Sequence, residues 1–323
     1  MKRRALLQAA PALALAPWPA ARAQGFPEKP IRYIVPVAPG GGSDLVGRTV
    51  CDRWAKVLNT SFIVDNQGGG GGVVAAQQAI RASADGYTLM QGYVATHGTS
   101  PATRKLPYDP IRDFTPIGMI GATPNVLVVD ASLPVKNFKE FVAWLNANKG
   151  KVSYGSAGPG SLTHLTMELL KQQLHVPMVH IPYRGIAPAI TDLIGGQTQA
   201  MFPGLAAALQ HIRSGRLRPL ALTGRRRAEQ LRDVPTLEEL GLKNFDAMQW
   251  YGVVGPAGMP REVVSRLNLS LAQVLSAPEL REKLAAEAVE PQAIAPEAFG
   301  KYIQADIARW SALVKAQNLH IDA

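Results

Sequence analysis

The sequence is short of cysteine, because Cys51 is the one thiol among 323 residues. A single cysteine excludes an internal disulfide and any metal site built from several thiolates. Cys51 falls in a helical pattern with Val46, Val50 and Trp54, which predicts a buried apolar side chain. After the first 23 residues, no apolar run approaches the roughly 18 residues that a membrane span needs. The sequence therefore predicts no transmembrane helix in that part of the chain.

Signatures of metal and acid–base chemistry are also missing. The six histidines stand at positions 97, 164, 175, 180, 211 and 320, and none forms the i, i+4 helical pair of a zinc enzyme. No pair of acidic residues has a spacing that suggests acid–base catalysis. We predict neither a metal nor an organic cofactor, and we single out His97 and His164 because they lie next to glycine-rich loops.

Three loop signatures come close to known motifs and fail. A hydrolase elbow needs Gly-x-Ser-x-Gly, but Tyr154 stands where the first glycine before Ser156 belongs. A nucleotide-binding loop needs a lysine that Gly42-Ser43-Asp44 lacks, and Leu45 replaces the last glycine of a dinucleotide fingerprint. The sequence therefore favours neither nucleotide chemistry nor a serine hydrolase.

The N-terminus has the three parts of a secretory signal peptide. A basic start (Lys2 to Arg4) precedes an apolar stretch over residues 5–16 and the small-residue site Ala21-Arg22-Ala23. We predict a signal peptide over residues 1–23, cleavage near Ala23 and a periplasmic location. The paired arginines leave export by the general or the twin-arginine route open. No cysteine stands directly after the cleavage site, so nothing indicates a lipid anchor.

Charge points to small anions rather than nucleic acid. Removing residues 1–23 takes away four basic and no acidic residues, so the formal net charge falls from +10 to +6. A moderately basic protein attracts small anions. The densest basic run, Arg225 to Arg227, is followed by Glu229 and Asp233 and lacks interleaved aromatics, so we interpret it as a solvated helix start.

Strand-like and helical patterns alternate over most of the chain, which is typical of parallel α/β sheets. Helical patterns dominate the tail, over residues 261–275, 278–287 and 296–317. About 300 residues after cleavage exceed one ordinary core, so we expect two domains. No long polar linker divides the chain, which favours a discontinuous arrangement in which the chain leaves the first domain and later returns.

Two glycine-rich loops follow predicted strands and precede predicted helices. We call residues 38–44 (Ala-Pro-Gly-Gly-Gly-Ser-Asp) the first glycine loop and residues 155–161 (Gly-Ser-Ala-Gly-Pro-Gly-Ser) the second glycine loop. Glycines let backbone N–H groups turn toward an anion, and Ser43 or Asp44 is suited to cap the helix that follows. Ligands in open sheets sit at the carboxyl ends of strands, so two such loops predict a ligand held between two lobes.

Motifs along the whole chain resemble the Bug receptors, the extracytoplasmic solute-binding proteins of tripartite tricarboxylate transporters. They read VPVAPGGGSD at 35–44, DGYTL at 85–89, LPYDP at 106–110, PNVLVV at 124–129, YGSAG at 154–158, HIPYRG at 180–185 and DVPT at 233–236. The resemblance implies an α/β, two-lobed periplasmic binding protein of type II with a ligand cleft between the lobes. It also implies a receptor without catalysis that captures a small carboxylate and delivers it to membrane transporter subunits.

The resemblance further implies the boundaries and the site. Residues 24–124 with 250–323 would form lobe 1, and residues 125–249 would form lobe 2. The implied ligand-binding residues lie on four loops: Val37, Gly41, Gly42, Ser43 and Asp44; Thr96 and His97; Ser156, Ala157, Gly158, Ser161 and His164; Pro203 and Gly204.

Two departures from the family pattern bear on the ligand. Val37 stands where an aromatic residue is common, so one wall of the cleft should be less bulky. The stretch from Met201 to Gly204 lacks the acid often found after the phenylalanine, which removes a partner for a ligand ammonium. We therefore predict a non-amino mono- or dicarboxylate.

Two alternatives remain open at this stage. One is a secreted hydrolase or isomerase that uses Ser156 with His164 or His97. The other is a ligand-sensing module for a signalling partner, which would share every feature above. The sequence does not identify the carboxylate, and we take a monomer as the default oligomeric state.

Overall fold

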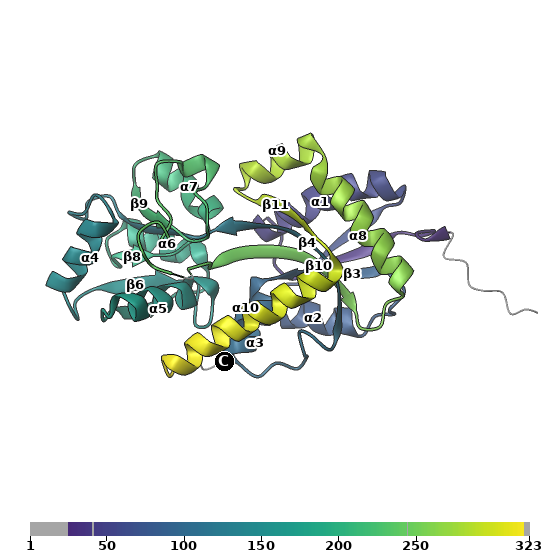
Figure 1. Ribbon diagram of the computed structural model, residues 1–323, viewed down its shortest axis with the longest axis horizontal. Coiled ribbons are helices and arrows are strands. Elements are labelled where there is room, and N and C mark those ends of the chain that lie inside the picture. The colour runs from purple at the N-terminus through teal and green to yellow at the C-terminus, as the bar shows by residue number, and fades with distance from the viewer. Residues whose placement is uncertain (1–24, 41, 244, 320–323) are drawn as a thin grey trace, which may run out of the picture.

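The computed structural model describes residues 25–40, 42–243 and 245–319. They form two lobes side by side, each built on a mixed sheet flanked by helices (Figure 1). The predicted signal peptide lies outside the described residues. Within these residues, no helix is both long and apolar enough to span a bilayer.

Lobe 1 contains a six-stranded sheet. Its strands, in spatial order, are β11 (Glu290–Ile294), β4 (Phe114–Pro124), β10 (Met248–Pro256), β3 (Thr88–Tyr93), β1 (Ile31–Val35) and β2 (Phe62–Asn66). Its helices are α1 (Gly42–Leu58), α2 (Val73–Ile80), α3 (Ser100–Thr103), α8 (Arg261–Ser276), α9 (Pro278–Ala286) and α10 (Pro296–Ala316), with the short 3-10 helix η2 (Gly70–Gly72) and the short π-helix η3 (Ala95–Thr99). Cys51 is buried in α1, as predicted.

Lobe 2 contains a five-stranded sheet. Its strands, in spatial order, are β7 (Val179–Pro182), β6 (Ser153–Ser156), β8 (Ala200–Met201), β5 (Val126–Asp130) and β9 (Leu217–Leu222). Its helices are α4 (Phe138–Ala147), α5 (Leu162–Leu174), α6 (Ile186–Ile194) and α7 (Leu205–Arg213), with the short 3-10 helix η4 (Glu229–Leu231). Alternate residues of β5 enter different apolar clusters, Leu127 with Val129 and Val126 with Val128, so both faces of this sheet are covered.

The predicted two-lobed α/β class is confirmed, but the sheets are mixed rather than parallel. In lobe 1, β10 runs antiparallel to β3 and β4, and β11 runs antiparallel to β4. Pattern analysis missed β4 and β11 altogether. Pro116, Gly118 and Gly121 interrupt β4 and Pro291 interrupts β11, and these residue types are typical of turns and irregular strands.

Two strands of lobe 1 connect directly to lobe 2, and we call β4 and β10 the hinge strands. β4 ends at Pro124 and β5 of the other sheet begins at Val126, while β10 begins at Met248 after the chain returns from lobe 2. The two strands pair along their length, from Met248 opposite Pro124 to Pro256 opposite Phe114. This sheet membership supports our proposal of lobes at 24–124 with 250–323 and at 125–249.

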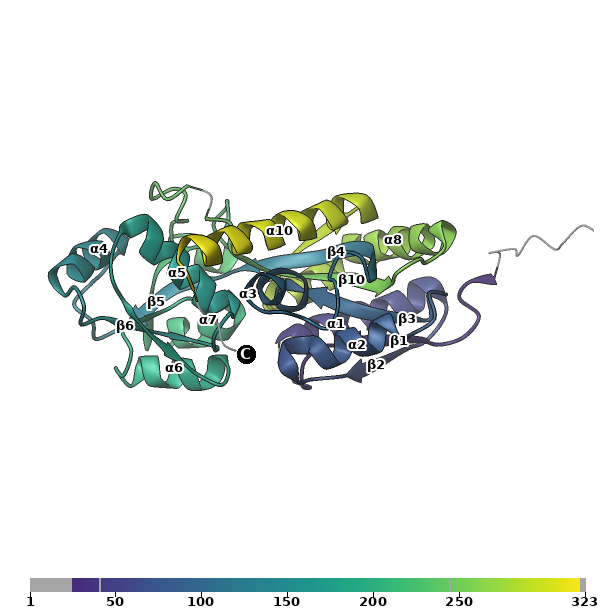
Figure 2. The same cartoon turned by 90° about the horizontal axis from the view of Figure 1, so that it is seen from below.

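Helix α10 runs along the hinge strands and reaches lobe 2 (Figure 2). From lobe 2, Leu162 and Leu165 of α5 join an apolar cluster with Trp250 and with Ile303 of α10. Beside this cluster, the buried Asp306 carboxylate accepts a hydrogen bond from Trp250 Nε1 at 2.9 Å and pairs with Arg309. Arg309 also donates to the carbonyl of Asp246, at the end of lobe 2. Asp306 therefore ties β10, α10 and the return crossing together.

His97 lies deep inside lobe 1 rather than at its surface. The ring is fully buried in η3 and packs edge-on against Phe114, with centroids 4.7 Å apart. Its Nδ1 contacts Thr96 Oγ1 at 2.8 Å, and within the described part of the chain its Nε2 has no hydrogen-bond partner. Burial lowers the pKa of His97 to about 3, so the ring is neutral near pH 7.

We expect Asp306→Ala to cost about 1–3 kcal/mol in free energy of unfolding, because it leaves the buried Trp250 Nε1 donor without an acceptor. Asp306→Asn should cost less, since an amide oxygen still accepts from Trp250 Nε1. Denaturant unfolding of both variants checks this. Equal and small losses would contradict the role given to the carboxylate.

Folding stability should fall as the pH drops from about 6.5 toward 3. The pKa of His97 is about 3 in the folded protein and close to 6.5 in the unfolded chain, so the unfolded state binds more protons in this window. The slope from one such group approaches about 1.4 kcal/mol per pH unit. His97→Phe should flatten the pH dependence measured by urea unfolding, whereas His175→Gln, at an exposed position, should not.

Candidate ligand-binding site

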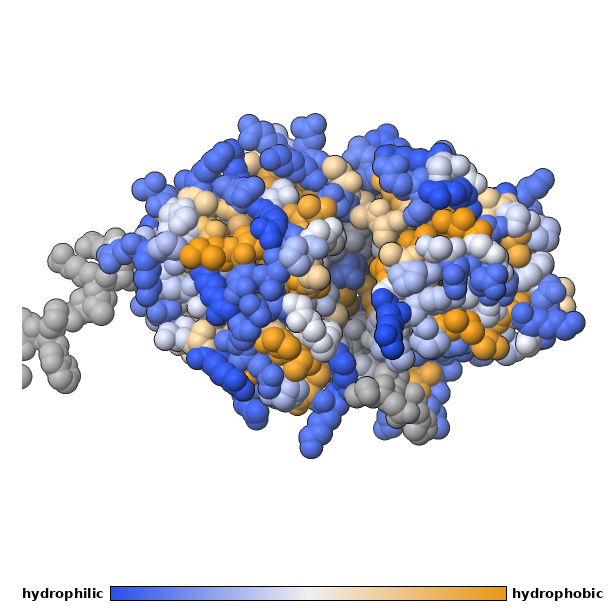
Figure 3. Space-filling model, turned by 180° about the vertical axis from the view of Figure 1, so that it is seen from behind, coloured by the Kyte–Doolittle hydropathy of each residue, from blue (hydrophilic) through white to orange (hydrophobic). Residues whose placement is uncertain are grey.

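The two lobes meet along a hollow that is visible from behind (Figure 3). The first glycine loop follows β1 in lobe 1, and the second follows β6 in lobe 2. β1 pairs in parallel with β2 and β3, and β6 pairs in parallel with β7 and β8. Both loops therefore lie at the carboxyl ends of parallel strands, where open α/β sheets bind their ligands.

Asp44 supports the first glycine loop from within. Its buried carboxylate accepts hydrogen bonds from Gly40 N at 2.8 Å, Asn66 Nδ2 at 2.8 Å and Arg48 Nε at 3.0 Å. Burial raises the pKa of Asp44, but these hydrogen bonds more than offset that effect, so its pKa lies below the ordinary value. The carboxylate is ionised and fully engaged, and it holds the loop in shape.

Ser43 is engaged in a similar way. Gln91 Nε2 donates to both the hydroxyl and the carbonyl oxygen of Ser43 at 2.8 Å. The prediction that Ser43 or Asp44 precedes the helix as its cap is wrong, because α1 begins at Gly42 and both residues lie in its first turn. Gly42 itself is exposed, with no atom within 4 Å of where a Cβ would stand. Gly41 lies outside the described residues, and Val37 is half-buried against the lobe 1 core.

The side chains of the second glycine loop also bond within the loop. Ser161 caps α5, accepting a hydrogen bond from His164 N at 3.3 Å, and its hydroxyl donates to Gly158 O at 2.7 Å. Ala157 N donates to Thr163 Oγ1 at 2.8 Å. Gly158 adopts a φ of +123°, a conformation that glycine favours. The loop is therefore preformed, and its side chains are committed to its own geometry.

A stack of three rings stands behind this loop. Tyr154, His180 and His164 lie nearly parallel, with successive centroids 5.0 Å and 3.9 Å apart. His164 Nδ1 accepts a hydrogen bond from Gly160 N at 3.1 Å, and His180 Nε2 contacts Ser156 Oγ at 2.6 Å. Burial and the proximity of His164 and Lys171 lower the pKa of His180 to about 3, and burial also lowers the pKa of His164. Two neutral imidazoles therefore brace the second glycine loop.

The predicted pairing of Ser156 with His164 or His97 is not found in the structure. Ser156 contacts His180 rather than His164 or His97, and its side chain is fully buried. Glu168, the nearest carboxylate to the stack, bonds to Tyr154 and Lys171 and lies 4.0 Å from His164. Among the described residues, no group of three or more potential metal ligands gathers anywhere.

Asn125 is a residue that sequence analysis did not assign to the site. It lies between the hinge strand β4 and β5 and forms a backbone bridge with Gly204, at the N-terminus of α7. Its side chain is 1% exposed, and neither amide atom has a partner within the described residues. Pro203 is buried beside it, accepting a hydrogen bond from Val126 N at 3.0 Å. The motif PNVLVV marked this position, but only the fold shows that its amide is uncommitted.

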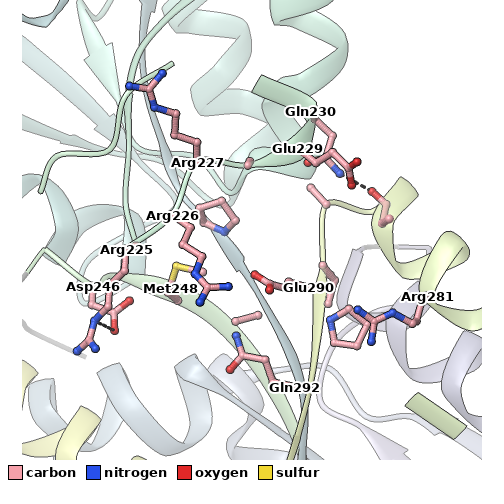
Figure 4. Close-up of a pocket in the computed structure, with 18 of the residues that line it drawn as sticks. Arg225, Arg226, Arg227, Glu229, Gln230, Asp246, Met248, Arg281, Glu290 and Gln292 are labelled. Carbon is pink, nitrogen blue, oxygen red and sulfur yellow. Dashed lines mark hydrogen bonds and ion pairs between the residues drawn. The ribbon is translucent and has the colours of Figure 1, made fainter. Parts of the chain in front are cut away.

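The predicted residues are thus distributed unevenly. The first and second glycine loops and Gly204 lie at strand or helix ends between the lobes, whereas Thr96 and His97 are buried inside lobe 1. The sequence places Thr96 and His97 next to a predicted loop, but it does not show that their side chains point into the core. A cavity of about 1070 Å³ lies elsewhere, and none of the predicted residues lines it (Figure 4).

Comparison with known proteins identifies the family. Residues 46–319 match the model of the tripartite tricarboxylate transporter family receptor, TctC. The chain is 32% identical over 299 residues to protein BugT of Bordetella pertussis, covering 91% of this chain and 90% of that protein. It is 33% identical over 323 residues to a UPF0065 protein of Pseudomonas sp. strain P51, covering 99% of this chain and 95% of that protein.

Solved structures agree. Rpa4515 of R. palustris, solved with adipate, has a TM-score of 0.81 and 33% identity, over 90% of this chain and 97% of that one. MatC of Rhodopseudomonas palustris, with bound malate, has a TM-score of 0.77 and 31% identity, over 90% and 100% of the two chains. The fold, the two loops and these matches lead to one conclusion: the chain belongs to the TctC, or Bug, family of periplasmic solute-binding receptors.

Proposed function

We propose that this receptor captures a small non-amino carboxylate, with dicarboxylates favoured, between the two glycine loops. The observation that carries the proposal is that the side chains of both loops are satisfied internally. The polar groups left to bind a ligand are backbone N–H groups of the loops and the side-chain amide of Asn125, which lies beside the N-terminus of α7 and has no partner within the described residues. Such groups favour a carboxylate.

Charge supports an acid without an amino group. Asp44 is the acidic residue of the first glycine loop, and its carboxylate already binds three donors. The stretch from Met201 to Gly204 contains no acid. A ligand ammonium would therefore lack a free carboxylate among the predicted site residues. Relatives solved with adipate and malate are consistent with a dicarboxylate.

Arg184 is our candidate for the second carboxylate. It follows Tyr183, whose N–H donates to Ser156 O at 3.1 Å, so it lies one residue from a contact with the second glycine loop. Its side chain is exposed and, within the described part of the chain, takes part in no hydrogen bond or ion pair. A guanidinium binds a carboxylate through two parallel hydrogen bonds.

Energetics favour contacts from both lobes. A hydrogen bond to a charged group contributes about 1.5–3 kcal/mol. Association costs about 4–15 kcal/mol in lost freedom, and micromolar binding needs about −8 kcal/mol. A few bonds from one lobe do not cover that difference, so the ligand must engage both. Ligand therefore favours the closed arrangement of the lobes.

We further infer export to the periplasm with cleavage near Ala23, and delivery of the ligand to membrane transporter subunits. We propose a monomer for this role.

The sensing alternative predicts a different partner. Co-purification from membranes should then recover a sensor ectodomain in place of transporter subunits. Recovery of the bound acid unchanged after incubation would separate a receptor from an enzyme.

We expect adipate or a related dicarboxylate to raise the melting temperature of the protein, and Gly42→Trp to abolish this shift. Gly42 is exposed with open space around it, so the indole should occupy the cleft without disturbing the fold. Leu269→Trp, on α8 at a 68% exposed position, is the control and should keep the shift. If the ligand raised the melting temperature of Gly42→Trp as much as that of the wild type, the first glycine loop would not be part of the binding site.

Arg184→Gln should weaken adipate binding at least ten-fold and leave hexanoate, which has one carboxylate, nearly unaffected. The expected loss corresponds to about 1.5–3 kcal/mol for a charged hydrogen bond. Isothermal titration calorimetry measures both acids, with Arg213→Gln at the end of α7 as the control for net charge. Equal losses for both acids would refute the assignment of Arg184 to the second carboxylate.

A further inference from the structure

The lobes touch at a second place, away from the glycine loops. Gln230 of η4 in lobe 2 donates from Nε2 to the carbonyl of Ala285 in α9 of lobe 1, at 2.7 Å. Next to this hydrogen bond, Ala288 of lobe 1 is 6% exposed and belongs to an apolar cluster whose other members come from lobe 2. Leu231 and Val234 of lobe 2 pack against this cluster. We call these residues the rear contact.

The rear contact borders the cavity of about 1070 Å³ (Figure 4). The cavity is lined by residues of the hinge strands (Ala122, Pro124, Met248), of α9 and β11 in lobe 1, and of the segment 224–230 in lobe 2. This segment carries Arg225 to Arg227, which are exposed and lie outside any helix. The predicted helix start at the arginines is therefore wrong, because the short helix η4 begins only at Glu229. Four arginines and four acidic residues line the cavity, so it has no net charge that would make it a second carboxylate site.

Sheet order places this cavity and the ligand cleft on opposite sides of the hinge strands. In lobe 1, β4 and β10 lie between β11 on one side and β3, β1 and β2 on the other. In lobe 2, β5 lies between β9 on one side and β8, β6 and β7 on the other. The glycine loops follow β1 and β6, whereas the rear contact lies beyond β11 and β9. A bend of the hinge strands that closes the cleft therefore separates the residues of the rear contact.

Unpaired charges of opposite sign face this cavity from the two lobes. Arg226 of lobe 2 and Glu290 of β11 both extend into it (Figure 4). Neither forms an ion pair within the described residues, whereas the flanking Arg225 and Arg227 pair with Asp246 and Glu239. Their attraction across the cavity acts to draw the lobes together on this side, and thus apart at the cleft.

We propose that the rear contact, assisted by Arg226 opposite Glu290, opposes closure of the cleft and so sets the ligand affinity. The inference about affinity rests on the proposed function, but the effect on lobe position does not. Ligand binding must break the Gln230–Ala285 hydrogen bond and expose Ala288. The free energy that this costs reduces the binding free energy gained at the glycine loops. Weakening a contact remote from the ligand therefore tightens binding.

Gln230→Ala should raise the affinity for adipate about two- to ten-fold, the range set by one hydrogen bond. The matched control is Gln173→Ala, which removes an equivalent bond, from Gln173 Nε2 to Lys243 O at 3.0 Å, that stays within lobe 2. It should leave the affinity unchanged. Unchanged or weaker binding in Gln230→Ala would overturn the proposal.

Charge reversal at Arg226 tests the role of the charge pair, because the proposal and a simple change in net charge predict opposite changes in affinity. Arg226→Glu places like charges across the cavity and should raise the affinity for adipate, although a basic residue is lost. Arg213→Glu makes the same change in net charge outside the cavity and should leave the affinity unchanged or lower it. Combining Arg226→Glu with Glu290→Arg should restore the wild-type affinity. Lower affinity in Arg226→Glu than in its control would overturn the proposed role of this charge pair.

Lobe position in the ligand-free protein separates this inference from the proposed function. Spin labels on Ile63→Cys and Val179→Cys, 58% and 52% exposed, report the distance between β2 and β7 on the cleft side of each sheet. Cys51 is buried and should stay unlabelled. Gln230→Ala and Arg226→Glu should each shift the distances measured by pulsed electron resonance toward shorter values. Unshifted distances would overturn the proposal even if adipate binds, and shifted distances would support it even if adipate does not.

Discussion

The antiparallel pairing of β4 with β10 is the constraint on which the rest of the structure depends. Both crossings between the lobes continue from these strands, at Pro124 and at Met248. Because their backbones hydrogen-bond to each other, the two crossings bend together rather than independently. Asp306 strengthens the same junction by joining Trp250 of β10 to α10. One hinge then determines both how the cleft closes and what separates behind it.

The glycine loops show why a receptor of this kind is preorganised. Asp44, Ser161 and Ser156 form hydrogen bonds within their own loops, and Ser43 is held by Gln91 of β3. A loop held in this way loses little conformational entropy when a ligand arrives. The side chains that would usually be called binding residues therefore act mainly by fixing the direction of backbone N–H groups. In our proposal, specificity falls to the few groups left uncommitted, such as Asn125 and Arg184.

In our proposal, opposing contacts on the two sides of one hinge together set the affinity of the receptor for its ligand. Contacts to the ligand act on the closed state and the rear contact acts on the open state, so each shifts the same equilibrium in a different direction. Substitutions at Gln230 or Arg226 can alter affinity without changing what is recognised. In a receptor that must also release its ligand, this separates affinity from specificity.

Sequence alone determined the family, the two-lobed α/β class, the burial of Cys51 and the position of both glycine loops, because these depend on local patterns and ordered motifs. It did not determine β4 and β11, whose prolines and glycines resemble turns, or the mixed direction of the sheets. Tertiary structure alone decided that His97 faces the core and that His180 contacts Ser156. It also brought Gln230 to Ala285, 55 residues away along the chain. The direction of a side chain and its distant partners are set by packing between elements, which no local pattern records.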